Sequence, residues 1–434
     1  MTIRKIWVHD EKYAQDSIVE KLARVRADMQ MRGIATLDVT AEDDVAWLCN
    51  LRGSGFGDEY TPKFRSAMRI EPDQAILYVD EEYFQDGVKE HLAAAGIEVR
   101  PYGMAPGCVT FTKCYKTRSE IENMKRSHIG DGVIVTKFIY RLKKMMREGI
   151  ELDEIQAAKM IDDMRAADPL YVGLSFTTID GYGPHGAVIH YMVTPETNVK
   201  LEPHGFMVLD SGGQYLDGTT DITRTIALGE LTDKERLYYT YVMQGMLRLL
   251  DARITKEEAQ SSYEALAKGD IYGARAVGRR LDDIARKPLR DHGLDYAHGT
   301  GHGVGYLGEV HELPVRIPEA IYRPGLVMSD EPGVYIDGEF GVRIENLMLC
   351  TEDEPQEQDG TDRLDAPDKH EACSLRFESL TWCPLERAAV AQQVMTDDDR
   401  RLYNEYQSKV WETISPYLDE DEKQWLREET AALA

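Results

Sequence analysis

The sequence predicts an α+β fold in two parts, and three observations lead to this class. The first 112 residues alternate short helical and β-strand patterns, which is typical of a small α/β unit. From residue 113 onward, helical blocks and Gly-rich strand blocks follow one another without the strict alternation of a parallel sheet, which indicates antiparallel strands in one layer and helices in another. The chain has 434 residues, of which 42% are hydrophobic, so it can bury more than one core.

The elements of the first part, residues 1–112, follow from apolar spacing and from the positions of glycine. Ile18, Leu22, Val25 and Met29 recur at helical spacing and predict an amphipathic helix. The expected elements, in chain order, are a helix over 17–33, a strand over 35–39, a helix over 41–51, a strand over 74–79, a helix over 81–95 that ends at Gly96, and a strand over 97–101.

The second part, residues 113–434, begins with a polar junction over 113–117. Thr117 and Glu120 have the spacing of a capping box and predict the start of a long helix, although Gly130 and Gly132 lower its intrinsic helix propensity. The remaining expected elements are a helix over 152–167, strands over 187–193, 205–210 and 219–226, a helix that begins at the capping pair Thr232 and Glu235, a helix over 272–285, Gly-rich strands over 296–350, an exposed acidic loop or hairpin tip over 351–371, and acidic helices in the last 40 residues.

The charge of the chain excludes two classes of partner. The formal net charge is −26, from 51 Lys and Arg against 77 Asp and Glu. Binding to nucleic acid or to an anionic membrane surface depends on basic side chains, so we expect neither partner. No stretch of about 18 apolar residues is present to span a bilayer, and the N-terminal sequence has no apolar core of a secretory signal. The six cysteines show no CxxC spacing, and we expect reduced thiols in a cytoplasmic protein.

Three segments place carboxylates or imidazoles inside apolar, Gly-rich strand patterns. They are FMVLDSGGQYLDGTTDITRT at 206–225, HGTGHGVGYLGEVHE at 298–312 and VMSDEPGVYIDGEFGVRIENLML at 327–349. In the first segment, Asp210 and Asp221 are 11 residues apart with two glycines between them, which suits a hairpin that brings both onto one layer. The residues of interest in the other two segments are His298, His302, His311, Glu331 and Glu345.

Four of these residues are carboxylates at the ends or centres of apolar strands, and they need cations because a buried carboxylate without a partner is very costly. Arg224 and Arg343 can supply part of this charge, but divalent ions bind several carboxylate oxygens at once. Four carboxylates and one imidazole suit a pair of Mn²⁺-like ions, and two metals that share a hydroxide provide a strong nucleophile. Taken singly, the residues have simpler interpretations, since Asp217 suits an ordinary turn and His302 suits a buried core histidine.

These segments resemble the pita-bread metallopeptidase family, which includes methionine aminopeptidases, prolidases and X-prolyl aminopeptidases. The resemblance is strongest to the cytosolic type of X-prolyl aminopeptidase (aminopeptidase P), and SFTTIDGYGPHGAVIHY at 175–191, AWLCNLRGS at 46–54 and QWLREET at 424–430 add to it. It implies a pita-bread catalytic domain after a small, truncated α/β N-terminal domain of the creatinase type. It also implies five metal ligands, Asp210, Asp221, His302, Glu331 and Glu345, and three further active-site histidines, His190, His298 and His311.

The resemblance further implies a metallo-aminopeptidase that hydrolyses the bond before a proline at the second position of a peptide. A hydroxide that bridges two divalent ions, expected to be Mn²⁺, attacks the carbonyl, Glu331 takes its proton, and His311 stabilises the oxyanion together with the metals. His190 and His298 hold the substrate and help to move protons to the prolyl nitrogen. The resemblance also implies a homodimer.

Two features depart from the pattern of this subgroup and leave alternatives open. Its members usually have three domains, whereas this sequence has no room for the first and has a shortened second. The sequence also has His185, in the segment GPHGA, where the subgroup usually has asparagine. A prolidase that cleaves only Xaa-Pro dipeptides is therefore the main alternative. A non-catalytic protein that keeps the fold is a second alternative, although such proteins typically lose metal ligands.

Overall fold

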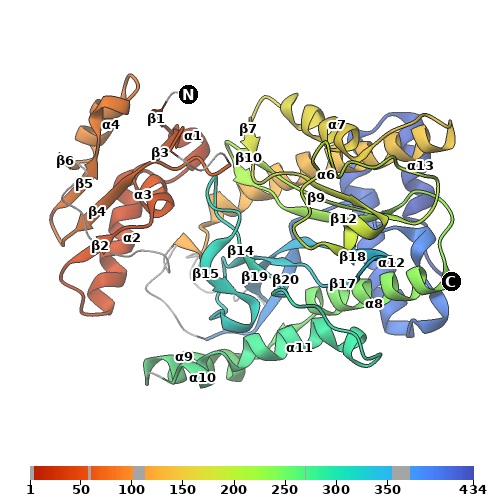
Figure 1. Ribbon diagram of the computed structural model, residues 1–434. Coiled ribbons are helices and arrows are strands. Elements are labelled where there is room, and N and C mark those ends of the chain that lie inside the picture. The colour runs from red at the N-terminus through yellow and green to blue at the C-terminus, as the bar shows by residue number, and fades with distance from the viewer. Residues whose placement is uncertain (1–3, 57–59, 101–112, 269, 354–371) are drawn as a thin grey trace.

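The computed structural model describes residues 4–56, 60–100, 113–268, 270–353 and 372–434. These residues form two lobes, a smaller one from the N-terminal part and a larger one from the rest of the chain (Figure 1). Helices and strands occur in both lobes, and the α+β class predicted from the sequence is confirmed. The boundary expected at 112/113 falls at the edge of segment 101–112, which lies outside the described residues, and we keep this division into two domains as a proposal.

The smaller lobe contains a four-stranded sheet in the order β2-β4-β5-β6, in which β5 and β6 are parallel and the other neighbours are antiparallel. A second, antiparallel pair joins β1 and β3. Apolar side chains of these strands and of helix α2 form a core separate from that of the larger lobe. The elements are β1 (Lys5–Val8), α1 (Glu11–Ala14), α2 (Ile18–Met31), β2 (Leu37–Val39), α3 (Glu42–Leu48), β3 (Leu51–Ser54), β4 (Ser66–Ile70), β5 (Ala75–Val79), α4 (Val88–Ala94) and β6 (Glu98–Arg100).

The predicted amphipathic helix over 17–33 is confirmed as α2, which begins with a capping box between Ser17 and Glu20 and buries the predicted apolar face. The helix expected over 81–95 is wrong as a single helix. A short 3₁₀ helix covers Glu81–Tyr83, and α4 begins only after Gly87, whose φ is 87°. A backbone in this left-handed conformation cannot continue a right-handed helix. The short strands β1, β3 and β4 are additional to the predicted elements.

The long helix predicted after Thr117 is confirmed as α6 (Arg118–Arg147), and Thr117 and Glu120 form its capping box. The backbone of Trp382 packs directly against Gly132 in this helix, and a Cβ at that position would overlap the carbonyl oxygen of Trp382. Gly132 therefore lowers helix propensity locally but permits close packing of α6 against the C-terminal part of the chain.

The strands of the larger lobe pair antiparallel throughout the described residues. The main sheets have the orders β12-β9-β8 and β13-β20-β19-β16-β14-β15, with the smaller sets β11-β10-β7 and β17-β18 beside them. The strands are β7 (Tyr171–Leu174), β8 (Ile179–Tyr182), β9 (Phe206–Ser211), β10 (Gly213–Tyr215), β11 (Gly218–Thr219), β12 (Ile222–Ala227), β13 (Arg253–Ile254), β14 (His302–Gly303), β15 (Glu312–Arg316), β16 (Val327–Asp330), β17 (Gly333–Ile336), β18 (Phe340–Arg343), β19 (Asn346–Glu352) and β20 (Leu375–Ser379).

The strand expected over 187–193 is wrong. Gly183–Ala187 form a 3₁₀ helix that contains Pro184, and the following residues turn again between Val188 and Tyr191. The backbone of Gly186 packs so closely against Gly341 of β18 that a Cβ on Gly341 would overlap it. The segment that carries His190 is therefore a loop folded against β18.

Helices cover the strands on two sides, with α7 against β7 and β8 and α8 against β16, β17 and β18 (Figure 1). The capping box predicted at Thr232 and Glu235 is confirmed at the start of α8. The helix expected over 272–285 begins later, at Ala276, and extends to Arg290, while α9 is additional. These helices are α7 (Glu154–Ala166), α8 (Asp233–Leu250), α9 (Lys256–Ala267), α10 (Ile271–Ala274), α11 (Ala276–Arg290), α12 (Asp397–Ile414) and α13 (Glu420–Glu429).

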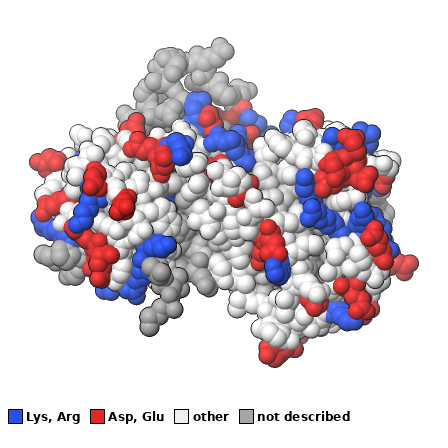
Figure 2. Space-filling view, turned by 90° about the horizontal axis from the view of Figure 1, so that it is seen from above, with Lys and Arg blue, Asp and Glu red and all other residues white. Residues whose placement is uncertain are grey.

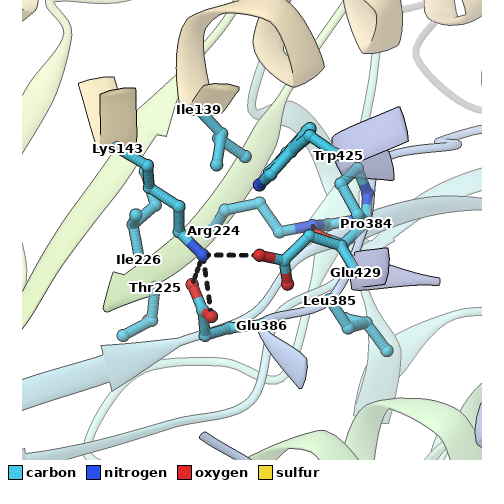
Figure 3. Close-up of a pocket in the computed structure, with 10 residues that line it drawn as sticks. All are labelled: Ile139, Lys143, Arg224, Thr225, Ile226, Pro384, Leu385, Glu386, Trp425 and Glu429. Atoms are coloured by element: carbon cyan, nitrogen blue, oxygen red, sulfur yellow. Dashed lines mark hydrogen bonds and ion pairs between the residues drawn. The ribbon is translucent and has the colours of Figure 1, made fainter. Parts of the chain in front are cut away.

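A buried ionic cluster attaches the C-terminal helices to α6. Lys143 of α6 contacts Glu386 at 2.7 Å and Glu429 of α13 at 3.1 Å, and all three side chains line a small pocket beside Arg224 and Trp425 (Figure 3). Because one ammonium group faces two carboxylates in this buried position, loss of Lys143 would leave two uncompensated charges. The cluster lies outside the candidate active site and serves to hold the last helices in place.

Acidic and basic side chains are interspersed over both lobes on the face seen in Figure 2, so on that face the surplus of acidic residues is not gathered into one patch.

Across the described ranges, no helix has both the length and the apolar character needed to cross a bilayer. The five cysteines within these ranges are free thiols, and Cys108 lies outside them. Strand β19 pairs with β20 and extends to Glu352, so the loop predicted to start at residue 351 begins later, and its residues 354–371 lie outside the described residues.

Candidate active site

The pairing of β9 with β12 places Asp210 and Asp221 on neighbouring strands, as the sequence predicts. Asp210 lies opposite Thr223 in this ladder, and Asp221 directly precedes β12. The residues between them form the small hairpin β10-β11, with Asp217 in its turn, which confirms the simpler interpretation of that aspartate. A Cβ at Gly212 would overlap the carbonyl oxygen of Thr220, so the close approach of these two backbone segments requires glycine.

The other three candidate ligands come from the six-stranded sheet and its edges. His302 opens β14, Glu331 directly follows β16, and Glu345 lies between β18 and β19. The backbone N–H of Glu345 donates to the carbonyl of Thr223, which ties this sheet to the strand that follows Asp221. Five side chains far apart in the sequence thus reach one place because two sheets meet there.

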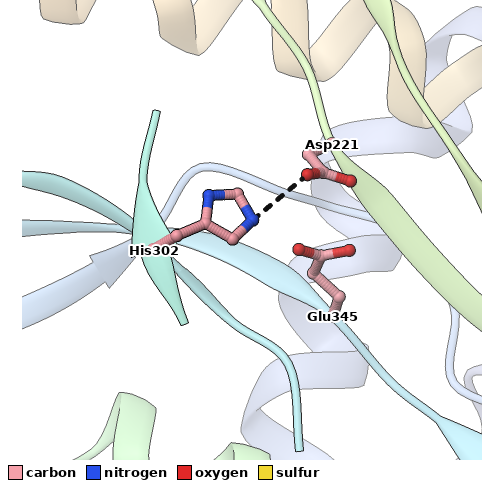
Figure 4. Close-up of side chains that lie close together, drawn as sticks. All are labelled: Asp221, His302 and Glu345. Atoms are coloured by element: carbon pink, nitrogen blue, oxygen red, sulfur yellow. Dashed lines mark ion pairs between the residues drawn. The ribbon is translucent and has the colours of Figure 1, made fainter. Parts of the chain in front are cut away.

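The structure brings Asp221, His302 and Glu345 into one buried cluster, in which one ligand atom of each lies within 4.8 Å of the others (Figure 4). The Nε2 atom of His302 is 3.5 Å from Oδ2 of Asp221 and 3.5 Å from Oε1 of Glu331. The fifth residue, Asp210, lies beside this cluster and is held by Arg343, whose Nη2 is 2.5 Å from Oδ2 of the aspartate.

Hydrogen bonds fix the orientation of these side chains and leave other oxygens free. Thr223 Oγ1 donates to Oε2 of Glu345 at 2.8 Å, and Ser329 Oγ accepts from the backbone N–H of His302. Among the described residues, no hydrogen-bond partner is present for three buried atoms, Oδ1 of Asp210, Oδ1 of Asp221 and Oε1 of Glu345. Buried oxygens without partners are rare in proteins, and here they occur on three of the five candidate ligands.

The electrostatics of the cluster fit a site for divalent cations. Burial first, and the neighbouring carboxylates second, raise the pKa of Asp221 well above its ordinary range and that of Glu345 to about 8. Burial also lowers the pKa of His302 to about 3, so its imidazole is neutral and able to bind a metal. Carboxylates and a neutral imidazole are the donor set that suits hard or intermediate divalent ions such as Mn²⁺.

Arg224, considered in the sequence as a source of positive charge, does not pair with these carboxylates. Its guanidinium donates to the backbone carbonyls of Glu345, Cys383 and Pro384 and to the side chain of Asn346. It therefore supports the backbone behind the site, while Arg343 is the arginine that contacts a candidate ligand.

Two of the three other predicted histidines, His298 and His311, have contacts that connect them to the candidate ligands. The rings of His302 and His311 are 4.2 Å apart and nearly perpendicular. His298 stacks on Tyr296, and burial lowers the pKa of His298 to about 4. His190 lies on the exposed loop described above. The structure thus brings the five candidate ligands and His311 together and connects His298 to Asp210 through Tyr335 and Arg343, whereas a place for His190 in this site is a proposal.

Tyr335 is a candidate functional residue that the sequence analysis missed. Its hydroxyl is 2.8 Å from Nε2 of His298 and accepts from Nη1 of Arg343 at 2.9 Å. Because the arginine can only donate, the tyrosine proton points to His298, and Nδ1 of His298 donates to the carbonyl of Gly299. A directed chain of hydrogen bonds therefore runs from Arg343 to His298. Tyr335 lies two residues after Gly333 in β17, and Gly333 pairs with Arg343 of β18. Residues two positions apart in a strand share a face, so this register is the signal that could have identified Tyr335 as a neighbour of Arg343.

His185, the residue that departs from the subgroup pattern, is engaged by a buried carboxylate. Its Nδ1 is 2.8 Å from Oε1 of Glu154, the first residue of α7, and its ring stacks on Tyr191 at 4.4 Å. Glu154 also accepts from the hydroxyl of Tyr191 and from the backbone N–H of Tyr182. This carboxylate therefore anchors both ends of the loop that carries His190.

Comparison with known proteins gives three family matches. Residues 122–352 match metallopeptidase family M24, residues 1–165 match the Creatinase/Prolidase N-terminal domain, and residues 374–433 match the C-terminal region of peptidase_M24. The probable Xaa-Pro aminopeptidase P of Paracoccidioides brasiliensis (strain Pb03) is 34% identical over 484 residues, which cover 98% of this chain and 74% of that relative.

Solved structures give two further comparisons. An X-prolyl aminopeptidase from Caenorhabditis elegans, described as a cytosolic enzyme with a di-nuclear active site, aligns with a TM-score of 0.85 at 26% identity, over 99% of this chain and 73% of that one. An Xaa-Pro dipeptidase from Bacillus anthracis aligns with a TM-score of 0.56 at 23% identity, over 85% of this chain and 99% of that one, and shares the fold.

Proposed function

This chain belongs to metallopeptidase family M24, and on that premise we propose that it is an X-prolyl aminopeptidase. Its pita-bread catalytic domain follows an N-terminal domain of the creatinase type, as expected from the sequence. The proposed reaction is hydrolysis of the bond between the first residue of a peptide and a proline at the second position. The observation that carries the proposal is the buried group of Asp221, His302 and Glu345, with Glu331 against the same histidine.

We propose that Asp210, Asp221, His302, Glu331 and Glu345 together hold two divalent ions, with Mn²⁺ as the expected metal. The support is the set of unpartnered buried oxygens and the raised pKa values, because both are relieved by cations. When bound, such ions supply Lewis acidity that polarises the peptide carbonyl and activates water.

The side chains of this chain supply the proton transfers and the binding of the peptide. Glu331 is less buried than Asp221 and Glu345, which suits a carboxylate that accepts a proton from the attacking water. His311 is neutral in its lowered-pKa environment, so it can donate a hydrogen bond to the developing oxyanion without carrying a charge of its own.

His298 and His190 are the residues that we assign to the binding of the substrate. His298 is kept neutral by burial, and Tyr335 and the carbonyl of Gly299 fix the orientation of its ring, which suits a residue that positions the substrate. His190 is exposed on its loop, which suits a residue that contacts the substrate. These roles follow from position and protonation state and remain proposals.

The main alternative is a prolidase, which must anchor the free carboxylate of a dipeptide. His185 is the residue near the entrance that raised this alternative, but its Nδ1 is bonded to Glu154 and its ring is stacked on Tyr191. The arginine nearest the cluster, Arg343, already contacts Asp210 and Tyr335. Both of these side chains are therefore engaged by groups of the protein, which favours an aminopeptidase.

The deciding experiment compares kcat/KM for an Xaa-Pro dipeptide and for an Xaa-Pro-Xaa tripeptide at the same Mn²⁺ concentration. We expect the tripeptide to be preferred by at least about tenfold, which corresponds to about 1.4 kcal/mol in transition-state binding. A clear preference for the dipeptide would assign this chain to the prolidases.

We also propose a cytoplasmic location and a homodimer. The free thiols of the described cysteines and the cytosolic relative from Caenorhabditis elegans support the location. The dimer rests on family resemblance and is tested by light scattering of the purified chain.

A further inference from the structure

We propose that Arg52 of the N-terminal lobe is a positioning residue for His311, because it holds the turn that connects His302 to His311 in the catalytic lobe. The assignment deepens the proposed function, since it rests on a catalytic role for His311. Arg52 belongs to the segment AWLCNLRGS, which carries part of the family resemblance but contributes no residue to the candidate active site.

Arg52 is 1% exposed, and its guanidinium bridges the two lobes. Its Nη1 donates to the carbonyls of Ala46 and Leu51 in its own lobe, each at 2.9 Å. In the other direction, Nε donates to the carbonyl of Leu307 at 2.8 Å and Nη2 to that of Tyr306 at 3.0 Å. All four acceptors are backbone atoms, so this buried cation fixes the path of the main chain.

The turn that Arg52 holds has an unfavourable backbone conformation. Leu307 has a φ of 44°, in the left-handed region that residues with a Cβ rarely adopt, and the N–H of Gly305 closes the turn on the carbonyl of Glu309 at 2.9 Å. Such a conformation costs on the order of 1–3 kcal/mol and persists only where its surroundings determine it. The two hydrogen bonds from Arg52 are made on either side of this strained residue.

The position of the turn connects this strain to the active site. It begins at Gly305, three residues after His302 of β14, and His311 follows four residues after Leu307. Because the rings of His302 and His311 are only 4.2 Å apart, a small change in the turn changes the position of His311 relative to the metal-binding cluster.

Further contacts hold both ends of the same segment. Lys63 of the N-terminal lobe is 2.5 Å from Glu309, and Lys116 is 2.5 Å from the buried carboxylate of Glu312, the neighbour of His311. Within the catalytic lobe, Gln214 donates to the carbonyl of Gly308 at 2.8 Å. The N-terminal lobe therefore contacts the segment between His302 and His311 through Arg52 and Lys63, and Lys116 and Gln214 hold the same segment from the catalytic part of the chain.

A simple role in holding the lobes together has to be distinguished from positioning, and the same segment offers the control. Trp47 also crosses between the lobes, where its Nε1 donates to Glu120 of α6 at 2.6 Å. That contact lies at the start of α6 and not on the His302–His311 segment. Trp47→Phe thus removes an interlobe hydrogen bond, whereas Arg52→Met removes the bonds to the turn.

The first test is a double-mutant cycle with the full chain loaded with Mn²⁺ and a proline-second tripeptide as substrate. We expect Arg52→Met to lower kcat by about 10- to 100-fold at unchanged metal content, and Trp47→Phe to lower it by less than about threefold. In a His311→Ala background, Arg52→Met should cost less than about twofold more, because its effect is transmitted through His311. Additive losses, or full activity of Arg52→Met, would overturn the proposal.

The second test is independent of activity and uses hydrogen–deuterium exchange of the same loaded chains. Arg52→Met should increase exchange of the amides in 303–311 at least about tenfold, and Trp47→Phe should leave them unchanged. Unchanged protection of these amides in Arg52→Met would contradict the positioning role of Arg52. A wild-type chain that is inactive on prolyl peptides would instead refute only the proposed function. If Arg52→Met does not fold, Arg52→Lys, which keeps the charge but has a different donor geometry, is measured instead with the same criteria.

Discussion

Replacement of Glu345 by glutamine is expected to stabilise the metal-free protein above neutral pH. Glu345 is buried among carboxylates, and one of its oxygens has no partner. Glutamine keeps the shape of the side chain and can still accept the hydrogen bond from Thr223, but it removes the negative charge, which burial and the neighbouring Asp210 make unfavourable. The same change removes a proposed metal ligand, so the variant should gain stability without metal and lose the stabilisation that metal provides.

The size of the effect follows from the raised pKa. Burial, with Asp210 adding to it, moves the pKa of Glu345 from 4.5 to about 8. A carboxyl group with a raised folded-state pKa favours folding fully below its unfolded pKa, and this advantage is lost as the pH rises to the folded value. At pH 7, the raised pKa of Glu345 lowers the free energy of unfolding by up to about 3 kcal/mol relative to acid pH, because each pH unit between the unfolded and the folded pKa changes it by about 1.36 kcal/mol. Since the proton is shared within the cluster, we expect about 2 kcal/mol.

The assay is thermal unfolding of chelator-treated wild type and Glu345→Gln at pH 5 and pH 8. At pH 8 the variant should melt a few degrees higher, about 2–4 °C, and at pH 5 the difference should be much smaller. Glu339→Gln is the matched control, because Glu339 is exposed and pairs with Lys234 on the surface. A wild type that is as stable as Glu345→Gln at pH 8 without metal would refute the reasoning.

Three further changes test other parts of the structure. His190→Ala should keep its metal, measured by elemental analysis, and lose activity by about 10²–10⁴-fold, the usual scale for general acid–base catalysis; loss of metal would place His190 among the ligands. Tyr335→Phe removes the hydroxyl between His298 and Arg343, so kcat should fall about tenfold with KM and metal content unchanged. Gly132→Ala should destabilise the chain by about 2 kcal/mol or more in denaturant unfolding, because the added Cβ overlaps the backbone of Trp382; unfolding equal to wild type would contradict that packing.

The features that sequence could predict are those with a local cause. The capping boxes at Thr117 and Thr232 are set by residues three positions apart, and both helices begin where expected. The candidate ligands were recognisable because carboxylates inside apolar strand patterns are unusual, and the structure brings Asp221, His302 and Glu345 together. These predictions depend on the chemistry of a few neighbouring residues.

The features that sequence could not predict depend on contacts between distant segments. The loop after Gly183 has apolar residues that suit a strand, but the close backbone of Gly341 and the buried carboxylate of Glu154 hold it as turns. Arg52 looks like a surface arginine in the sequence, because its partners are backbone carbonyls more than 250 residues away, and carbonyls leave no mark on the sequence.

The claim that a buried group of carboxylates and one histidine binds two ions needed for peptide hydrolysis is tested most directly by metal titration. The chain is freed of metal with a chelator, Mn²⁺ is added in steps, and bound metal and hydrolysis of a proline-second tripeptide are measured in the same samples. We predict no activity without metal, recovery that is complete near two ions per chain, and no recovery in Asp221→Asn. Full activity in a preparation shown to be metal-free, or full recovery in Asp221→Asn, would contradict the account.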